Sequence, residues 1–374
     1  MSTTTDTSAE VEALAERLLQ AALGAVDLFA VYLGDRLGWY RSLIQDGSAT
    51  AEELAQRTGT HPRYAREWLE QQAASGLLVV EGASEVGAAV MPAQRGPGDG
   101  AARFGLRPAA AEVLGDPDSL SYLAPLGRML AAPAQRLPDL LEAYRTGGGV
   151  SWAELGVDAR EAQADMNRPW YVHRLPSALA SAPDLRPVLM RPQASLAEIG
   201  CGAGWASIAL ARALPTATVD AFDVDEASIE MAQRNVAAAG LAARVTVHHV
   251  DAEQLPERRF DMVLALECLH DMPYPVRVLG ACHRALRDDG VVVVMDEAVG
   301  ETFTAPADDV DRLMYGFSLL VCLPDGMSHP DSAATGTVMR PATLRRYARE
   351  AGFRAVDVLP VEDFGFWRFY RLAP

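Results

Sequence analysis

The sequence contains no lysine, because all 33 of its basic residues are arginine. Enzymes that form a Schiff base with their substrate, and P-loop nucleotide hydrolases, each depend on one specific lysine, so both classes are excluded. Cysteine is scarce as well: the four cysteines are scattered, without a CxxC pair or a cysteine and histidine cluster of zinc spacing. We therefore expect no disulfide, no structural zinc and no other metal site.

Long apolar runs and net positive charge are also missing. No run approaches the roughly 20 apolar residues of a membrane-spanning helix, and the amino terminus is acidic rather than signal-like. We therefore expect a cytoplasmic protein with no membrane contact. The formal net charge of −17 repels nucleic acid unless a local patch reverses it. The chain has 374 residues, 49% of them hydrophobic, which suffices for two domains with packed cores.

The stretch LAEIGCGAGWASIAL, residues 196–210, predicts a strand, a glycine loop and a helix. Gly200, Gly202 and Gly204 can adopt positive φ angles and let a ligand lie against the backbone, and the free N–H groups of the next helix favour polar groups. The pattern therefore predicts a nucleotide-like ligand. A dinucleotide fingerprint, GxGxxG, would need glycine or alanine where Trp205 stands, which favours adenosylmethionine over NAD.

The next predicted strands carry polar residues at their ends. Residues 218–222 lead to Asp223, which is placed to bind both hydroxyls of a ribose, with Asp225 as the alternative. Residues 244–250 lead to Asp251, which could accept a hydrogen bond from an adenine amino group. Residues 260–266 open into the segment ECLHDM. Because parallel strands bind ligands at their carboxyl edge, these ends are candidates for the site.

The succession EIGCGAG, FDVD, VDAEQLP and FDMVLALECLHDM resembles the class I S-adenosylmethionine-dependent methyltransferases. The resemblance covers residues 168–374 and implies an α/β fold, with a Rossmann-like sheet of seven strands whose last strand is antiparallel. We accordingly expect a fifth strand over 291–295, a helix over 341–351 and a terminal hairpin. S-adenosylmethionine would be the cofactor and S-adenosylhomocysteine the product. The expected cofactor-binding residues are Glu198, Gly200, Cys201, Gly202, Gly204, Asp223, Val224, Asp251, Ala252 and Glu267.

The amino-terminal part predicts four helices and a two-stranded wing. The third helix starts at a capping box on Thr50, the fourth runs from His61 to a stop at Gly76, and the wing strands fall at 77–80 and 85–91. This winged helix-turn-helix pattern suggests DNA binding in isolation. However, the would-be recognition helix carries two arginines beside two glutamates, whereas a groove-binding helix should be clearly basic.

The same arrangement is similar to the small-molecule O-methyltransferases of plants and actinobacteria. Their amino-terminal winged-helix domain forms the dimer and covers the acceptor site. The segments DRLGWYRSL and REWLEQQAASGLL are closer to a group of two-domain actinobacterial methyltransferases whose acceptor is generally unassigned. The resemblance thus implies a homodimer formed through this domain. We expect a winged-helix domain over 1–95, a linker and helical connector over 96–167, and a methyltransferase domain over 168–374.

Within the connector, residues 92–110 are rich in glycine, proline and alanine and predict a linker or wing tip. Helices are expected over 118–131, 138–144 and 159–180, the last one interrupted near its prolines. Met166, Trp170 and Tyr171 on that helix could close over the methionyl end of the cofactor, or belong to the core.

Methyl transfer to a protonated acceptor needs a base, and His270 is the candidate because an imidazole titrates near neutral pH. In the plant-type O-methyltransferases the catalytic histidine lies in a similar LHDW segment. The resemblance therefore places the base at His270 and an adjacent acid at Asp271, although Met272 replaces the tryptophan.

The histidine-orienting glutamate of that family has no evident counterpart, and Glu297 and Glu301 are possible substitutes. A structural alternative for His270 is that it packs, or caps a helix beginning near Pro273. The other histidines, the pair 248–249 and His283, are expected to be structural.

Residues 302–340 predict a partly helical insertion above the carboxyl edge of the sheet, and this insertion would form the wall of the acceptor pocket or pack in a dimer. Its lack of charge over 314–324 suggests a small, largely apolar acceptor. The expected acceptor-binding residues are Met314, Phe317 and His329, and His329 is a second possible base.

These observations predict a methyltransferase that acts on a small acceptor, most simply at oxygen, with nitrogen, sulfur and carbon left open. A competing hypothesis is a regulator whose winged helix binds DNA and whose second domain only senses adenosylmethionine. A third is an adenosylmethionine-binding enzyme that catalyses decarboxylation or hydroxylation, and sequence cannot separate it from the first.

Overall fold

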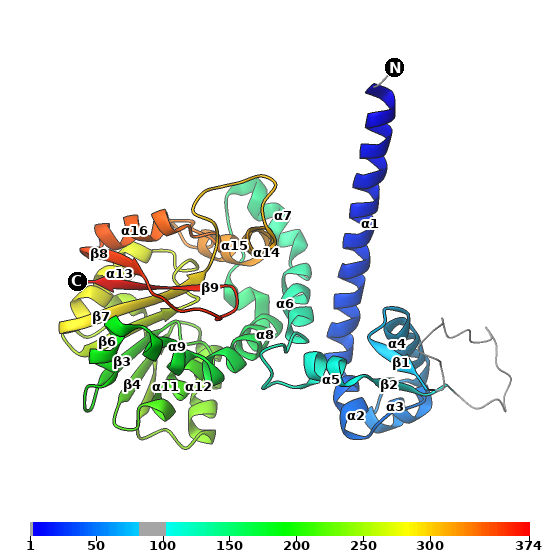
Figure 1. Ribbon diagram of the computed structural model, residues 1–374, viewed down its shortest axis with the longest axis horizontal. Coiled ribbons are helices and arrows are strands. Elements are labelled where there is room, and N and C mark those ends of the chain that lie inside the picture. Colours follow the sequence, from blue (N-terminus) through cyan, green and yellow to red (C-terminus); the bar gives the residue numbers. More distant parts are fainter. Residues whose placement is uncertain (1–2, 82–101) are drawn as a thin grey trace. The chain divides into compact units, whose positions relative to one another are not determined.

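The computed structural model describes residues 3–81 and 102–374, with side chains from residue 7 onward. These residues form two compact units, Met1–Ala131 and Ala132–Pro374, and each is described by itself. Figure 1 shows the helices and strands of both units.

The first unit contains the predicted succession of helices followed by a short sheet. Thr50 begins the third helix with a complete capping box, in which its hydroxyl accepts from the Glu53 N–H and the Glu53 carboxylate accepts from the Thr50 N–H. A core around Tyr40, Leu54 and Trp68 holds these elements together. The elements are α1 (Thr3–Arg36), α2 (Trp39–Gln45), α3 (Ala51–Thr58), α4 (Pro62–Ala74), β1 (Leu78–Val80), β2 (Phe104–Leu106), α5 (Pro108–Gly115) and α6 (Pro125–Ala134).

The strand that pairs with β1 was not predicted. The expected wing strand at 85–91 lies outside the described residues, and β1 pairs instead with β2, antiparallel, inside the segment expected to be a linker. Phe104 is buried in the core, and Arg103 forms an ion pair with Glu53. Burial of one aromatic side chain, Phe104, therefore stabilises a three-residue strand in a segment whose composition predicts a linker.

Helix α1 differs from the sequence expectation about apolar runs. Thr7–Arg36 is long and apolar enough to span a membrane by length and composition, which is weak support for a span near the amino terminus. Its carboxyl half, however, makes polar contacts within the first unit. The Asp27 carboxylate accepts hydrogen bonds from Gln71 and Ser75, and Asp35 forms an ion pair with the buried Arg128 at 2.7 Å.

Helix α4, the would-be recognition helix, has both of its arginines beside carboxylates. Arg63 pairs with Glu67 at 2.5 Å, and Arg66 pairs with Glu52 at 3.1 Å. These pairs offset the charges that a DNA-binding helix would present to phosphates, and the absence of nucleic-acid binding stays a prediction.

The second unit is built on the expected seven-stranded sheet, with strand order β5-β4-β3-β6-β7-β9-β8. The first five strands in this order are parallel, and β9 runs antiparallel to both of its neighbours, so the predicted closure of the sheet by an antiparallel hairpin is confirmed. The strands are β3 (Ser195–Ile199), β4 (Thr218–Asp223), β5 (Val245–His249), β6 (Phe260–Leu266), β7 (Leu286–Glu297), β8 (Ala355–Val358) and β9 (Trp367–Ala373).

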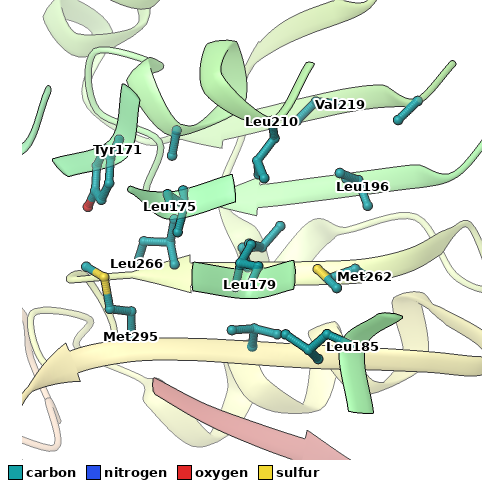
Figure 2. Packing of buried hydrophobic residues seen from close by; sticks show 14 of the residues in the cluster. Tyr171, Leu175, Leu179, Leu185, Leu196, Leu210, Val219, Met262, Leu266 and Met295 are labelled. Atoms are coloured by element: carbon teal, nitrogen blue, oxygen red, sulfur yellow. The ribbon is translucent and has the colours of Figure 1, made fainter. Parts of the chain in front are cut away.

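The central strands of this sheet are buried along their whole length, because helices cover both of its faces. On one face α9 (Leu175–Ser181), α11 (Trp205–Ala213) and α12 (Glu226–Ala238) pack on the strands, and on the other α13 (Pro275–Ala285) and α16 (Pro341–Glu350) do so. Figure 2 shows Leu175, Leu179 and Leu185 packed over Met262 and Leu266. Short helices at Pro183–Leu185, α10 (Arg186–Leu189) and Ala252–Gln254 complete the layers.

Two helical segments precede the sheet, and their bounds differ from expectation. Helix α7 spans Leu137–Thr146, and α8 spans Trp152–His173 with a kink at Gly156, where the backbone is not helical. After this kink α8 continues through Pro169 and ends only before Arg174. The predicted helix over 118–131 starts later, at Pro125 in α6. The insertion after β7 contains α14 (Asp309–Phe317), a π-helix (Ser318–Cys322) and α15 (Leu323–Met327).

Candidate active site

The glycine loop joins β3 to α11 at the carboxyl edge of the sheet. Gly200, Gly202 and Gly204 all have positive φ angles, of 62°, 50° and 76°. A Cβ at Gly200 would lie 2.7 Å from the Cβ of Cys268, whereas one at Gly202 would meet nothing within 4 Å. The start of the glycine loop, at Gly200, therefore packs tightly on the segment after β6. At Gly202, two residues later, the backbone of the loop faces open space. That open backbone is a suitable contact for a ligand.

Glu198 lies at the carboxyl end of β3, is only 2% exposed, and accepts a hydrogen bond from the Ser207 hydroxyl of α11. Burial raises the pKa of Glu198 to about 7, with a further contribution from Asp223. Glu198 thus ties the first turn after the loop to the strand before it. Cys201, next in the loop, is buried.

Asp223, at the end of β4, stabilises the glycine loop through hydrogen bonds to its carboxylate. Its carboxylate accepts hydrogen bonds from the N–H of Gly202, at 2.8 Å, and from the N–H of Asp225, at 2.9 Å. Burial raises the pKa of Asp223. Val224, the next residue, is exposed, and its carbonyl accepts a hydrogen bond from His249.

The alternative ribose ligand, Asp225, is engaged elsewhere. It is the N-cap of α12, where it accepts from Ser228, and it forms an ion pair with Arg160 of α8 at 2.6 Å. Although burial opposes this effect, the hydrogen bonds from Arg160 and Ser228 lower the pKa of Asp225. Asp225 therefore fixes α8 to the edge of the sheet. Asp223, which contacts the glycine loop directly, is the better placed of the two candidate ribose ligands.

Asp251 and Ala252 follow β5 at the same edge. The Asp251 side chain is exposed and accepts from the N–H of Glu253 at 2.8 Å, which caps the short helix Ala252–Gln254. Ala252 is buried beneath it. One carboxylate oxygen of Asp251 makes this cap contact, and the exposed side chain remains accessible to a ligand.

Glu267, directly after β6, has a positive φ of 54°, which is uncommon for a residue with a side chain. Its carboxylate accepts a hydrogen bond at 2.6 Å from the amide of Asn167 on α8. Burial raises the pKa of Glu267 to about 7 in spite of that hydrogen bond. Sequence analysis missed Asn167, because nothing in a helical pattern marks one polar residue as facing a strand end 100 positions later.

His270 lies at the centre of a group of buried carboxylates and is itself 3% exposed. Its Nδ1 is 3.0 Å from Asp296 Oδ1 and 3.3 Å from Glu297 Oε2, and its Nε2 is 3.3 Å from Asp271 Oδ1. Burial alone would lower the pKa of His270, but the three carboxylates outweigh it and raise the pKa well above its ordinary value. Burial raises the pKa of Glu297, so this carboxyl holds a proton more readily than usual.

The capping alternative for His270 is wrong. Helix α13 begins at Pro275 after Tyr274, and His270 instead contacts the end of β7. Of the two proposed substitutes for the orienting glutamate, Glu297 contacts the ring and Glu301 pairs with Arg345. Asp296, which has the shortest contact, was missed. The available signal was that β6 and β7 are parallel neighbours, so their last residues meet at one edge.

The insertion closes over the segment that carries His270. The N–H of Ala333 donates to Pro273 O at 2.8 Å, the Tyr274 hydroxyl donates to Pro330 O at 2.6 Å, and Arg340 ties Asp311 to the loop after β7. Of the predicted acceptor residues, Met314 is buried, Phe317 is half-buried and His329 is exposed.

The remaining aromatic and histidine candidates make structural contacts. Tyr171 is buried in the core, and Trp170 packs on Phe364 and Trp367, while Met166 is half-buried. His248 is 2.6 Å from Asp220, and His283 packs on Phe353. These contacts agree with the structural interpretation of both histidines.

Comparison with known proteins gives the family. Residues 196–290 match the family described as methyltransferase domain. The ubiquinone biosynthesis O-methyltransferase of Pseudomonas aeruginosa (strain LESB58) is 31% identical over 179 residues, which cover 47% of this chain and 71% of the relative. The chain belongs to the class I S-adenosylmethionine-dependent methyltransferases.

Solved structures agree with this methyltransferase over nearly its whole length. The mitomycin 7-O-methyltransferase MmcR has a TM-score of 0.72 at 22% identity and covers 98% of this chain and 99% of its own. Human N-acetylserotonin methyltransferase, solved in complex with S-adenosylmethionine, has a TM-score of 0.66 at 16% identity and covers 96% and 97%. At these identities the likeness shows the fold.

S-adenosylmethionine is the cofactor of this methyltransferase, and the residues present fit it. The Gly202 backbone faces open space, and Asp223 and Asp251 follow neighbouring strands, where a nucleoside would meet both. When bound, the cofactor supplies an activated methyl group on a cationic sulfonium.

Proposed function

We propose that this methyltransferase acts on a hydroxyl of a small, largely apolar acceptor, with His270 as general base. The observation that carries the proposal is the buried imidazole whose Nδ1 is held by Asp296 and Glu297. This contact fixes the ring and leaves Nε2 as the nitrogen that can receive a proton from an acceptor. Asp271, beside Nε2, is the adjacent acid of the proposal.

The cofactor site of this proposal comprises the glycine loop and the ends of three strands. Asp223 binds the ribose, Asp251 the adenine amino group, and Glu267 the methionyl end together with Asn167. Close packing of Cys268 and Met272 on Gly200 brings the segment with His270 against this loop. The base and the cofactor loop are therefore built from one packed unit, as in-line methyl transfer requires.

The insertion 302–340 supplies the acceptor wall in this proposal. It carries Met314 and Phe317 on α14, and hydrogen bonds fasten it to the segment after His270. Such a wall would exclude water from the acceptor. The exposed position of His329 makes His270 the preferred base.

His270 also belongs to two groups whose ligand atoms lie within 4.8 Å of one another, one with Asp296 and Glu297 and one with Asp271 and Cys322. We assign both groups to proton handling, and the absence of a metal stays a prediction. Treatment with a chelator such as EDTA is then expected to leave turnover unchanged.

We further propose a cytoplasmic homodimer formed through the winged-helix part, residues 1–95, with residues 96–167 as connector and 168–374 as the catalytic domain. Helix α1 supports the dimer, because it exposes a row of large apolar side chains, including Leu14, Leu18 and Phe29. Light scattering of the intact chain tests the dimer, and a monomer at micromolar concentration would refute it.

The test of the proposed chemistry is methyl transfer from S-adenosylmethionine to a panel of phenols, followed by mass spectrometry. His270→Ala is expected to lower turnover by about 100-fold or more while the calorimetric affinity for the cofactor stays nearly unchanged. His283→Ala, a histidine that packs on Phe353, serves as control. Equal turnover of both variants would exclude His270 as the base.

A further inference from the structure

Three polar side chains from three separate segments converge on the free side of the His270 ring. Asp271 follows β6, Cys322 ends the π-helix and Thr337 precedes α16. A ring nitrogen of His270, a carboxylate oxygen of Asp271 and the Cys322 sulfur lie within 4.8 Å of one another. Thr337 faces the same thiol. The sequence links only Asp271 to His270, because the two residues are adjacent in the chain.

Two of these groups have buried polar atoms whose hydrogen-bonding capacity is not filled within the protein. Among the described residues, Asp271 Oδ1 has the 3.3 Å ion pair with His270 Nε2 but no well-formed hydrogen bond, and Thr337 Oγ1, on a side chain that is 2% exposed, has only the Cys322 thiol beside it. A buried polar atom without a full set of hydrogen bonds destabilises the folded state, so folded proteins rarely place two such atoms together without a reason. The Asp271 side chain is otherwise 37% exposed, so this place is open to an entering molecule.

The backbone around Thr337 is built to hold it there. Gly336 has a φ of 70°, and a Cβ at this position would collide with the hydroxyl of Ser318 at the start of the π-helix. The loop therefore packs directly on the π-helix that carries Cys322. π-Helices occur as single turns in proteins and are frequent at functional sites.

The spacing of the acceptor atoms indicates what they bind. Asp271 Oδ1 is 3.3 Å from His270 Nε2, so hydrogen-bond donors that reach these two atoms must themselves be close together. Hydroxyl groups on adjacent carbon atoms have this spacing. A carboxylate oxygen can only accept from such a group, and the Thr337 hydroxyl can accept as well.

We propose that Asp271, Cys322 and Thr337 form a polar subsite for a second hydroxyl of the acceptor, on the carbon next to the one whose hydroxyl meets His270 Nε2. This inference rests on the proposed function and narrows it to acceptors with two neighbouring hydroxyls. The apolar insertion then contacts the remainder of the acceptor, and this subsite selects the pair of hydroxyls.

The test compares 3,4-dihydroxyacetophenone with its 3-hydroxy and 4-hydroxy analogues by calorimetry, in the presence of S-adenosylhomocysteine. The intact protein is expected to bind the dihydroxy probe about five- to tenfold more tightly than either analogue, as one added hydrogen bond implies. Thr337→Val keeps the shape of the side chain and removes the hydroxyl, and it should reduce this preference to about twofold or less. Thr335→Val is the matched control, because Thr335 bonds to Tyr347 instead.

Equal affinity for the three probes, no binding of any of them, or an unchanged preference in Thr337→Val would overturn the subsite. Methyl transfer to the same probes separates this inference from the proposed function. Preferential binding that Thr337→Val loses, without any methylated product, would retain the subsite and refute oxygen methylation. Equal methylation of all three probes would retain oxygen methylation and refute the subsite.

Discussion

Replacing Asp296 by asparagine tests whether the carboxylates around His270 set its proton affinity. Asp296 Oδ1 is 3.0 Å from Nδ1, and an asparagine at this position would keep the shape of the side chain and an oxygen that can accept from the ring. The substitution therefore removes a negative charge and retains the orienting hydrogen bond. Glu297 and Asp271 remain, each at 3.3 Å from a ring nitrogen.

The expected magnitude follows from these distances. An opposite charge within about 4–6 Å of an ionisable group shifts its pKa by roughly 1–3 units, and burial leaves this charge poorly screened. We expect the pKa of His270, which the carboxylates hold well above 6.5, to fall by about 1–2 units in Asp296→Asn. A general base must be unprotonated, so turnover should rise with pH through this pKa, and the variant should reach its plateau at lower pH by the same amount.

The assay is a pH titration of the isotope-labelled histidine rings by NMR, which needs no acceptor. The chain has seven histidines, and His270→Gln assigns the signal. Glu301→Gln is the control, because Glu301 is a carboxylate four residues beyond Glu297 that pairs with Arg345. An unchanged or higher His270 pKa in Asp296→Asn, or an equal shift in Glu301→Gln, would refute the reasoning.

Three further predictions concern the cofactor loop and the buried acids. Asp223→Ala should weaken S-adenosylmethionine binding in calorimetry by about 10- to 100-fold, because it removes the charged hydrogen bonds to the ribose hydroxyls, and NADH is the ligand that neither protein should bind. Retained affinity would exclude the ribose contact. Gly200→Ala should lower the urea midpoint more than Gly202→Ala, since only the first adds a clash, with Cys268, to the positive-φ penalty; equal midpoints would contradict it. The pKa values of Glu198 and Glu267 are raised to about 7. The folded protein therefore binds more protons than the unfolded chain between about pH 4.5 and 7, and its free energy of unfolding should fall as pH rises through that window. Glu198→Gln should flatten this decline in thermal scans, and a rise in stability over the window would show the sign to be wrong.

The sequence predicted the parts of the site that depend on local pattern. The glycine loop and the acidic strand ends follow from residues close together in the chain, the antiparallel closure follows from the family resemblance, and the sheet places all three as expected. The missed residues depend on pairing between distant segments. Asp296 contacts His270 only because β7 lies beside β6, and Asn167 contacts Glu267 only because the fold brings α8 to the end of a strand 100 residues later.

The missed strand β2 has a different cause. Three residues flanked by arginines, with a glycine in the middle, carry too little periodicity to indicate a strand, and burial of Phe104 in the core decides the structure of this segment. The expected acceptor residues show the same limit. The apolar character of the insertion was evident in the sequence, but which of its side chains face His270 depends on the π-helix and on Gly336, neither of which has a sequence signal.

The charge of the carboxyl edge gives a physical reason for the choice of cofactor. Glu198, Asp223 and Glu267 lie at neighbouring strand ends, and burial raises the pKa of each because it disfavours the ionised form, in spite of the hydrogen bonds that each carboxylate accepts. A dinucleotide would bring a pyrophosphate to the glycine loop and add negative charge to this edge. A sulfonium cofactor brings a positive charge instead and stabilises the ionised carboxylates. The acids at this edge therefore favour the cationic cofactor, as does Trp205, which stands where a dinucleotide fingerprint needs glycine or alanine.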